Sequence, residues 1–310
     1  MPRLLLATAI AASCAATLAA CSLVNTLDDL RSDTSAEAGT GRDSGRTSNP
    51  GTDASPVDPL ADSGVADSNT SADASADAAA AKTYRDEVLA DSPSVYLRLG
   101  EKSGATAKDE IGAFPGTFPT NGGFVYGEPG AIVGDTDTAI TLNDGKRPIT
   151  FGAGLDFAGT ASFTVELWAK QTGYDVYSWT VDHFAWAAQR NGWGLRLSDD
   201  QFGVERWANG STNGSTSFAT GPIGLGVYHH IVATFDGASI CIFRDTIKMN
   251  CSPATNSPIQ KTTGIWTLGA RNDCPTNCQG FIGSLDEFAI YPTALPEARI
   301  QAHYNKGTGK

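Results

Sequence analysis

Hydrophobic and polar residues alternate in many short runs after residue 92. Five of these runs carry apolar side chains at every second position, namely residues 95–99, 139–142, 163–168, 193–197 and 231–235. Clusters of Gly, Asn and Asp separate the runs. A period of two is typical of strands with one buried face, and about a dozen such runs fit between residues 93 and 291. The pattern predicts an all-β sandwich or barrel.

The run at residues 163–170 assigns its side chains to two faces. Phe163, Val165, Leu167 and Ala169 lie on one face, and Thr164, Glu166, Trp168 and Lys170 on the other. The apolar face is expected to pack in the core. For Trp168 the alternatives are a wetted concave face or burial under a covering loop, and its large apolar ring favours burial.

Two short helices are predicted at the ends of this region. Residues 83–89 have Thr83 as an N-cap and acidic residues in the first turn. Residues 295–304 have Pro296 near the first turn and Gly307 after the end.

The beginning of the chain has the composition of an export signal. Arg3 precedes an apolar run that ends in Leu18, Ala19, Ala20 and Cys21, and this tetrad resembles the lipobox of bacterial lipoproteins. We expect residues 1–20 to be a lipoprotein signal peptide and Cys21 to carry a diacylglycerol that anchors the chain to a membrane without spanning it. The alternative is a plain secretory signal. Either way the protein is exported, and lipidation predicts an envelope lipoprotein at the outer membrane or cell surface.

Residues 21–82 are predicted to be a disordered linker rich in Ala, Asp and Ser. From residue 22 to 81 there are 11 acidic residues, 3 basic residues and no aromatic residue. Such a segment buries too little apolar surface to offset its ordering entropy, so we expect a flexible tether of about 40–50 Å. The chain carries a net charge of -12 and no basic run, which excludes nucleic acid as an expected partner. The globular domain is expected over residues 83–310.

Four blocks of this domain resemble a known family. They are residues 93–101 (PSVYLRLGE), 163–170 (FTVELWAK), 228–237 (YHHIVATFDG) and 280–291 (GFIGSLDEFAIY). In this order they resemble laminin-G-like domains of the concanavalin A-like lectin/glucanase superfamily, over residues 84–306. The resemblance implies a jelly-roll β-sandwich of two antiparallel sheets with a short C-terminal helix. It does not define a ligand, because this fold hosts lectins, adhesins and hydrolases.

The resemblance also implies a calcium ion. Asp286, in the last long strand, and Asp109, in the N-terminal region, match the positions that hold it in related sandwiches. Calcium needs six to eight oxygen ligands, so backbone carbonyls near Gly112 or Gly283 would complete the shell. The alternative is that Asp286 caps a turn and Asp109 is a solvated loop residue.

The cysteines of the domain predict two disulfides. Cys241, Cys251, Cys274 and Cys278 are an even number in an exported domain. A hairpin turn at Asp245 and Thr246, with one bulged residue, would place Cys241 opposite Cys251. We therefore pair these two, and pair Cys274 with Cys278 across a short loop. A zinc site is the alternative, although neither pair has metal-finger spacing.

Aromatic residues crowd the segment between residues 172 and 193. Together with Trp207 and Glu205 they could form a sugar-stacking surface, in which rings face the pyranose and polar groups bond its hydroxyls. The predicted ligand-binding residues are Tyr177, Trp179, Trp186, Arg190, Glu205 and Trp207. In the structural alternative Phe184, Trp186 and Trp193 pack inside, which leaves Tyr177, Trp179 and Trp207 exposed.

Catalytic motifs are missing from the sequence. There is no Glu-x-Asp-x-Glu array of the kind that retaining glycosidases need, and Asp286 and Glu287 are expected on opposite faces of a strand. His229 and His230 are likewise expected to point to opposite sides, in structural roles. We predict a non-catalytic, surface-anchored module that binds a cell-wall or extracellular carbohydrate. The alternatives are a protein-binding adhesin, a structural surface lipoprotein and, less favoured, a glycoside hydrolase.

Overall fold

The computed structural model describes residues 81–310, apart from residues 176, 187–189, 199–200, 209–213, 255–258, 260, 262–264 and 275–277. The predicted signal peptide, Cys21 and most of the predicted linker lie outside the described residues. In the described part there are two helices, α1 (Tyr84–Ala90) and α2 (Glu297–Gly307). The strands are β1 (Val95–Leu97), β2 (Thr106–Ala107), β3 (Gly116–Thr117), β4 (Phe124–Pro129), β5 (Thr138–Leu142), β6 (Ile149–Ala153), β7 (Phe163–Gly173), β8 (Trp179–Ala185), β9 (Asn191–Leu197), β10 (Gln201–Trp207), β11 (Gly214–Thr220), β12 (His229–Phe235), β13 (Ser239–Arg244), β14 (Ile247–Pro253), β15 (Ile265–Leu268) and β16 (Ile282–Tyr291).

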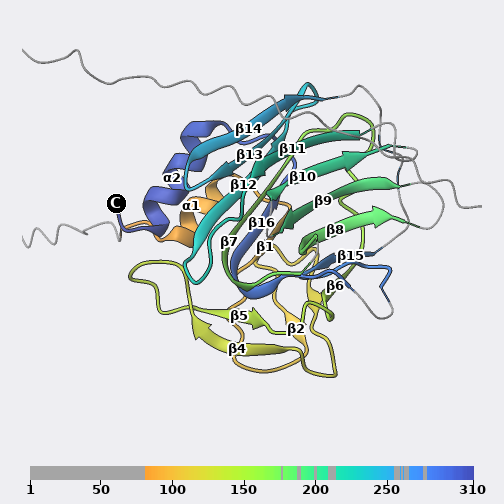
Figure 1. Cartoon of the computed structure of the whole chain (residues 1–310). Helices are drawn as coiled ribbons and strands as arrows, with labels where there is room; N and C mark the ends of the chain where they lie inside the picture. The colour runs from red at the N-terminus through yellow and green to blue at the C-terminus, as the bar shows by residue number, and fades with distance from the viewer. Residues whose placement is uncertain are drawn as a thin grey trace, which may run out of the picture. The chain divides into compact units, whose positions relative to one another are not determined.

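The strands form two antiparallel sheets packed face to face (Figure 1). The first sheet has the order β14-β13-β12-β7-β16-β5-β4, with β1 paired to β16. The second has the order β11-β10-β9-β8-β15-β6-β3-β2. The main hydrophobic core lies between them. The all-β sandwich prediction is confirmed, and the five alternating runs correspond to β1, β5, β7, β9 and β12.

Strand β7 shows the predicted division of its side chains. Phe163, Val165 and Leu167 belong to the core between the sheets, whereas Trp168 lies in a second cluster with residues of α1 and α2. Trp168 is 3% exposed, so its burial is confirmed. Its cover is a helix rather than a loop, because the Tyr304 ring stacks on it at 5.9 Å. In Figure 1 both helices lie together against the first sheet, away from β8–β11.

Both helices form where the sequence predicts them. Thr83 caps α1 in a capping box with Asp86, which satisfies two backbone donors. Pro296 occupies the N-cap position of α2, and Gly307 is its last residue, so α2 ends later than the pattern predicts. No described helix is long and apolar enough to cross a membrane.

The four cysteines of the domain form the predicted disulfides. Asp245 and Thr246 have positive φ angles of 49° and 77° in the turn between β13 and β14. A register shift follows Ile242, and Cys241 then pairs with Cys251 across the two strands. Cys274 pairs with Cys278. The zinc alternative is wrong, because both cysteine pairs are bonded.

Removing the disulfide between β13 and β14 should destabilise the domain. The double variant Cys241→Ser, Cys251→Ser is expected to lose roughly 2–3 kcal/mol of unfolding free energy, because a cross-link of this loop length limits the unfolded chain. Urea denaturation of the variant and the unmodified protein measures the loss. The pair Cys274 and Cys278 closes a shorter loop, so its double Ser variant should lose less. An unchanged urea midpoint in the first variant would contradict the expectation.

Candidate functional site

The candidate site lies on the face of β8–β11 that points away from the core. In β9 and β10 the residues Leu195, Leu197, Phe202 and Val204 enter the core. Their neighbours in each strand therefore point outward. We call this surface the aromatic-arginine face. Its residues are Tyr177, Trp179, Phe184, Trp186, Arg190, Arg196, Glu205, Trp207, Phe218 and Arg271.

Arg190 lies at the centre of this face. Its Cζ atom is 4.8 Å from the ring centroid of Phe184, 4.9 Å from those of Trp186 and Trp207, and 5.6 Å from that of Trp179. These are cation–π distances. The Arg190 Nη2 group also donates a hydrogen bond to Oε2 of Glu205. Four rings and one carboxylate therefore fix the plane of this guanidinium.

Glu205 connects Arg190, just before β9, with Arg196 in β9. Its Oε2 atom also accepts a hydrogen bond of 2.7 Å from Nε1 of Trp207. Its Oε1 atom lies 3.5 Å from Nε of Arg196. The Arg196 guanidinium lies over Phe218 at 4.5 Å and over Tyr177 at 4.9 Å. The Glu205 carboxylate thus pairs with both Arg190 and Arg196.

A second carboxylate holds Trp186 in place. Oδ2 of Asp182 accepts hydrogen bonds from Trp186 Nε1 at 3.0 Å and from the Asn272 backbone N–H at 2.8 Å. Burial raises the pKa of Asp182 to about 6, and these hydrogen bonds act against that rise. The Arg271 guanidinium also lies over Trp186, with its Cζ atom 3.9 Å from the ring centroid. Arg271 is itself neutralised by Asp273, through two hydrogen bonds of 2.9 Å.

Glycines in the neighbouring strands allow the rings to lie flat on the sheet. A Cβ atom on Gly194 would come within 2.8 Å of both Trp179 and Phe184. A Cβ atom on Gly214 would come within 2.4 Å of Trp207. Side chains at these positions would therefore push the rings off the surface.

The structure brings all six predicted ligand-binding residues together. Tyr177 is 46% exposed, and Trp186 and Trp207 are half-buried. Trp179 is 2% exposed, so the expectation that it stays exposed is wrong. Its ring is buried because Gly194 leaves room beneath it and Arg190 and Arg196 lie over it. The Arg190 guanidinium covers the ring faces that lie near it. A ligand on this surface would therefore meet guanidinium groups more than bare aromatic rings.

Three contributors to the face were missed by the sequence analysis. Arg196 alternates with core residues in the run 193–197, so the period of two contained a signal for it. Phe218 and Arg271 lie far along the chain from the aromatic segment. They join it because β11 pairs with β10 and because β15 pairs with β8.

The two residues predicted to hold calcium differ in their surroundings. Asp109 is 5% exposed, and its two oxygens accept backbone N–H groups of Tyr96 at 2.9 Å, Ile111 at 3.2 Å and Phe114 at 2.8 Å. It is therefore not a solvated loop residue, and its oxygens are used in holding the loop.

Asp286 is 2% exposed and keeps one oxygen without a partner. Oδ2 accepts the Ala131 N–H at 2.7 Å, whereas Oδ1 is buried with no hydrogen bond. Burial raises the pKa of Asp286 well above its usual range. Among the described residues, no group of three or more His, Cys, Asp or Glu side chains is placed to hold a metal. Asp109 does not fit the predicted ligand set, and calcium binding stays a prediction that thermal unfolding with and without calcium would test.

Strict alternation fails at Asp286 and Glu287. Glu287 has a positive φ of 51°, and the register with β7 shifts between Asp286 and Ala289. The expectation of regular, opposite faces is therefore not met, because a bulge interrupts the strand. Both residues are buried, and Glu287 is paired with Arg98 at 2.7 Å.

The adjacent histidines point to different surroundings, as predicted. His230 is fully buried, and its Nε2 lies 2.7 Å from Oε1 of Glu166. His229 is half-buried, with Nδ1 2.5 Å from Oδ2 of Asp245. Neither lies on the aromatic-arginine face.

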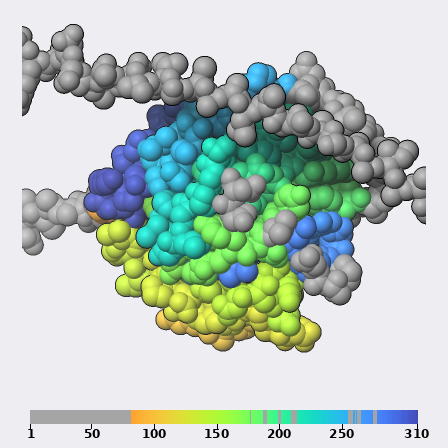
Figure 2. All heavy atoms as spheres, in the orientation of Figure 1, coloured from red at the N-terminus to blue at the C-terminus, as the bar shows by residue number. Residues whose placement is uncertain are grey.

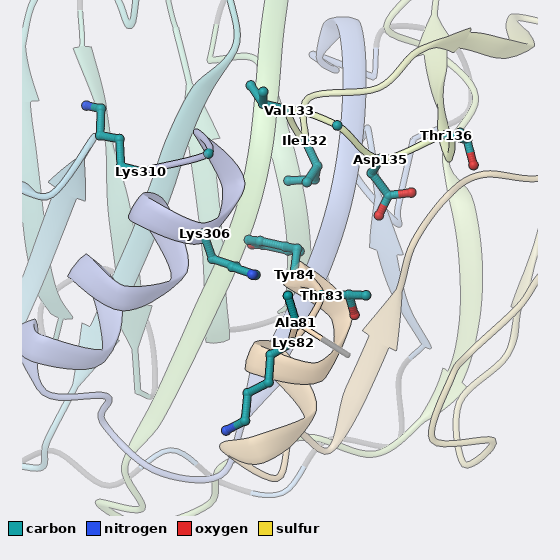
Figure 3. Close-up of a pocket in the computed structure, with 12 residues that line it drawn as sticks. Ala81, Lys82, Thr83, Tyr84, Ile132, Val133, Asp135, Thr136, Lys306 and Lys310 are labelled. Atoms are coloured by element: carbon teal, nitrogen blue, oxygen red, sulfur yellow. The ribbon is translucent and has the colours of Figure 1, made fainter. Parts of the chain in front are cut away.

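A cavity of about 490 Å³ lies elsewhere, between the start of α1, the end of α2 and residues 132–136 (Figure 3). Figure 2 shows these parts next to one another, with the end of α2 in deep blue beside residues in yellow. In Figure 3 Lys306 points toward Tyr84, whereas Lys82 and Lys310 extend away from it. The charged groups that line this cavity do not point toward a common centre. We therefore place the candidate site on the aromatic-arginine face.

Comparison with known proteins identifies the family. A family model described as the concanavalin A-like lectin/glucanases superfamily matches residues 136–301. The chain belongs to this superfamily. No curated protein matches the sequence.

Solved structures of this superfamily fold are similar to the chain at low identity. A botulinum neurotoxin type C structure, which concerns cell entry through two ganglioside molecules, has a TM-score of 0.52 and 12% identity. The botulinum neurotoxin serotype C1 binding domain has a TM-score of 0.50 and 12% identity. The match covers 70% and 69% of this chain, and 52% of each toxin chain. A third structure is domain 4 of AbnA, a GH43 extracellular arabinanase from Geobacillus stearothermophilus, in complex with arabinotriose. Its TM-score is 0.47 at 19% identity, and the match covers 68% of this chain and 98% of that domain. The chain thus spans about half the length of the toxin structures, and at these identities the likeness shows the fold alone.

Proposed function

We propose that residues 83–310 form a non-catalytic carbohydrate-binding module. The observation that carries the proposal is the aromatic-arginine face, where half-buried indoles stand beside guanidinium groups with fixed planes. Sugars bind where apolar ring surface and oriented hydrogen-bond donors meet. Membership of a lectin and glucanase superfamily is consistent with this, as is the ganglioside dependence of a toxin that shares the fold.

We further propose that the module acts at the cell envelope. Cys21 would carry the lipid, and the acidic linker would hold the domain away from the membrane. Replacing Cys21 by Ser should then move the protein from the membrane fraction to the soluble fraction. Continued membrane association of this variant would contradict lipid anchoring.

Binding to a glycan array and to cell-wall polysaccharide tests the module. We expect the full chain carrying Cys21→Ser to bind. Trp207→Ala should weaken binding at least about tenfold, because the Trp207 ring packs against Arg190 and its Nε1 donates to Glu205, so the variant removes two contacts that hold the site. Val133→Ala is the control, since Val133 is 64% exposed and lies at the cavity beside α2. Absence of any glycan binding would contradict the proposal. Capture of a surface protein, insensitive to added sugar, would favour the protein-binding alternative.

A further inference from the structure

We propose that the carbohydrate bound by the aromatic-arginine face carries an anionic group, a carboxylate or a sulfate, that contacts Arg190 and Arg196. This inference rests on the proposed function and specifies its ligand class.

Two guanidinium groups share one carboxylate at ion-pair distance at the centre of the face. Arg190 and Arg196 both pair with Glu205, and in the described part of the chain neither forms an ion pair with another carboxylate. Arg271 is neutralised separately by Asp273. Glu205 is therefore the carboxylate at ion-pair distance from both guanidinium groups, and the buried Asp182 acts on Arg190 from farther away.

Both arginines also have hydrogen-bond donors that are not used. Within the described residues the Nε atoms of Arg190 and Arg196 are buried and have no hydrogen-bond acceptor. The nearest carboxylate oxygen to the Arg196 Nε is that of Glu205 at 3.5 Å, which is too long for a good hydrogen bond. A buried donor without an acceptor is unfavourable. A ligand oxygen at the solvent-accessible part of Arg190 would add an acceptor to a guanidinium group whose donors the described residues satisfy only in part.

The charges are layered in depth. The Arg190 side chain is 24% exposed and the Glu205 side chain 4% exposed. Solvent therefore reaches Arg190 more readily than Glu205, and the Arg196 side chain is 9% exposed. An approaching anion meets the cation first, whereas a cationic ligand would be repelled before it reached Glu205.

The rings beneath the arginines give the cations a fixed orientation. Arg190 lies against four rings, and Arg196 lies over Phe218 and Tyr177. A planar guanidinium held in one orientation matches the oxygens of a carboxylate or sulfate. Because its plane is already fixed, little side-chain entropy is lost when the anion binds.

The net charge of the whole chain cannot explain a preference for anionic glycans. The net charge of -12 repels an anionic polymer at long range. Nonspecific attraction of acidic polysaccharide is therefore not expected, and any preference for an acidic sugar must come from this face.

Matched pairs of glycans test the inference. The full chain with Cys21→Ser is applied to an array of uronate, sialate and sulfated glycans, each beside the same glycan with its carboxylate reduced to an alcohol or its sulfate removed. We expect binding to acidic members at least about tenfold stronger than to their neutral partners, decreasing as salt concentration rises. Equal or stronger binding to the neutral partners overturns this inference and leaves the proposed function standing. Binding to neither class overturns both.

Variants of one arginine on the face and one arginine outside it separate the effect of the face from a general loss of positive charge. Arg190→Gln should weaken binding to acidic glycans more than binding to their neutral partners and bring the acidic-to-neutral affinity ratio close to one. Arg147→Gln is the matched control, because Arg147 pairs with Asp144 at the surface and lies outside the aromatic-arginine face, and it should leave the ratio unchanged. Thermal unfolding verifies that both variants are folded. If Arg190→Gln does not fold, Arg196→Gln repeats the test. An unchanged acidic-to-neutral ratio in a folded variant overturns the inference.

Discussion

Replacing Glu166 by Gln is expected to lower the free energy of unfolding by about 3–5 kcal/mol, the cost of breaking a buried charge network. Glu166 is a residue of β7, on the face that packs against the two helices, and it is fully buried. Its oxygens accept the Tyr291 hydroxyl at 2.7 Å and the Tyr84 hydroxyl at 3.2 Å, and lie 2.7 Å from His230 Nε2 and 2.9 Å from His303 Nδ1. A Gln amide has the same shape, but it carries no charge and turns one acceptor into a donor facing other donors.

The same variant should change how stability depends on pH. Burial alone would raise the pKa of Glu166, but the charge of His303 and the hydrogen bonds from His230 and His303 hold that pKa well below its usual range. Burial alone would lower the pKa of His303, but Glu166 raises it, with Asp91 contributing. The stabilisation from His303 is complete below about pH 6.5 and is lost as pH rises through its folded-state pKa. The stabilisation from Glu166 is present above about pH 4.3 and is lost as pH falls through its lowered pKa.

Urea denaturation at several pH values measures both effects. Unmodified protein should be less stable on the alkaline side of neutrality than at pH 6, and Glu166→Gln should flatten this slope. Glu297→Gln is the control, because Glu297 is 64% exposed and its ion pair with Lys248 lies at the surface. We expect that change to cost less than about 1 kcal/mol. An unfolding free energy for Glu166→Gln within about 1 kcal/mol of the unmodified protein would show that the network does not hold the helices to the sheet.

This network illustrates what the sequence could and could not predict about the fold. Alternation placed Glu166 and Trp168 on one face of β7, and the structure confirms it. The sequence also predicted a C-terminal helix. It contained no signal that the helix packs on this face, because that contact joins His303 to a residue 137 positions away. Local rules specify strands and caps, whereas docking depends on the whole topology.

The candidate site shows the same division between near and distant residues. Strands β8, β9 and β10 follow one another along the chain and pair with one another, so residues close in sequence meet on one face. This is why Trp179, Arg190 and Glu205 could be grouped from the sequence. Arg271 joins only through the pairing of β15 with β8. The burial of Trp179 depends on the missing side chain of Gly194 in the next strand, a detail of packing that periodicity does not contain.

Replacing Arg98 by Met is expected to cost about 3–4 kcal/mol of unfolding free energy, because it removes the cation from a cluster of carboxylates. Arg98 donates to Glu287 through Nε at 3.0 Å and Nη2 at 2.7 Å, and to Asp135 at 2.7 Å, and its Nε lies 3.1 Å from Asp137. The Glu287 side chain is fully buried, so its charge cannot turn to water once Arg98 is gone. Met keeps much of the apolar stem, so the loss reports mainly on charge and hydrogen bonding.

Two further variants define the origin of that loss. Arg98→Lys keeps the positive charge but loses the planar guanidinium that reaches three carboxylates. Its loss of unfolding free energy should therefore be smaller than that of Arg98→Met but still measurable. Arg147→Met removes a similar arginine whose pair with Asp144 lies at the surface, where Arg147 is 42% exposed, and should cost less than about 1 kcal/mol. Equal unfolding free energies for Arg98→Met and Arg147→Met in urea denaturation would mean that the bulge within β16 tolerates its acidic residues without a counter-ion. The expected order of loss is Arg98→Met, then Arg98→Lys, then Arg147→Met. The first two differ because Lys keeps a cation beside the buried Glu287, and the third is smallest because the Asp144 carboxylate is less completely removed from water.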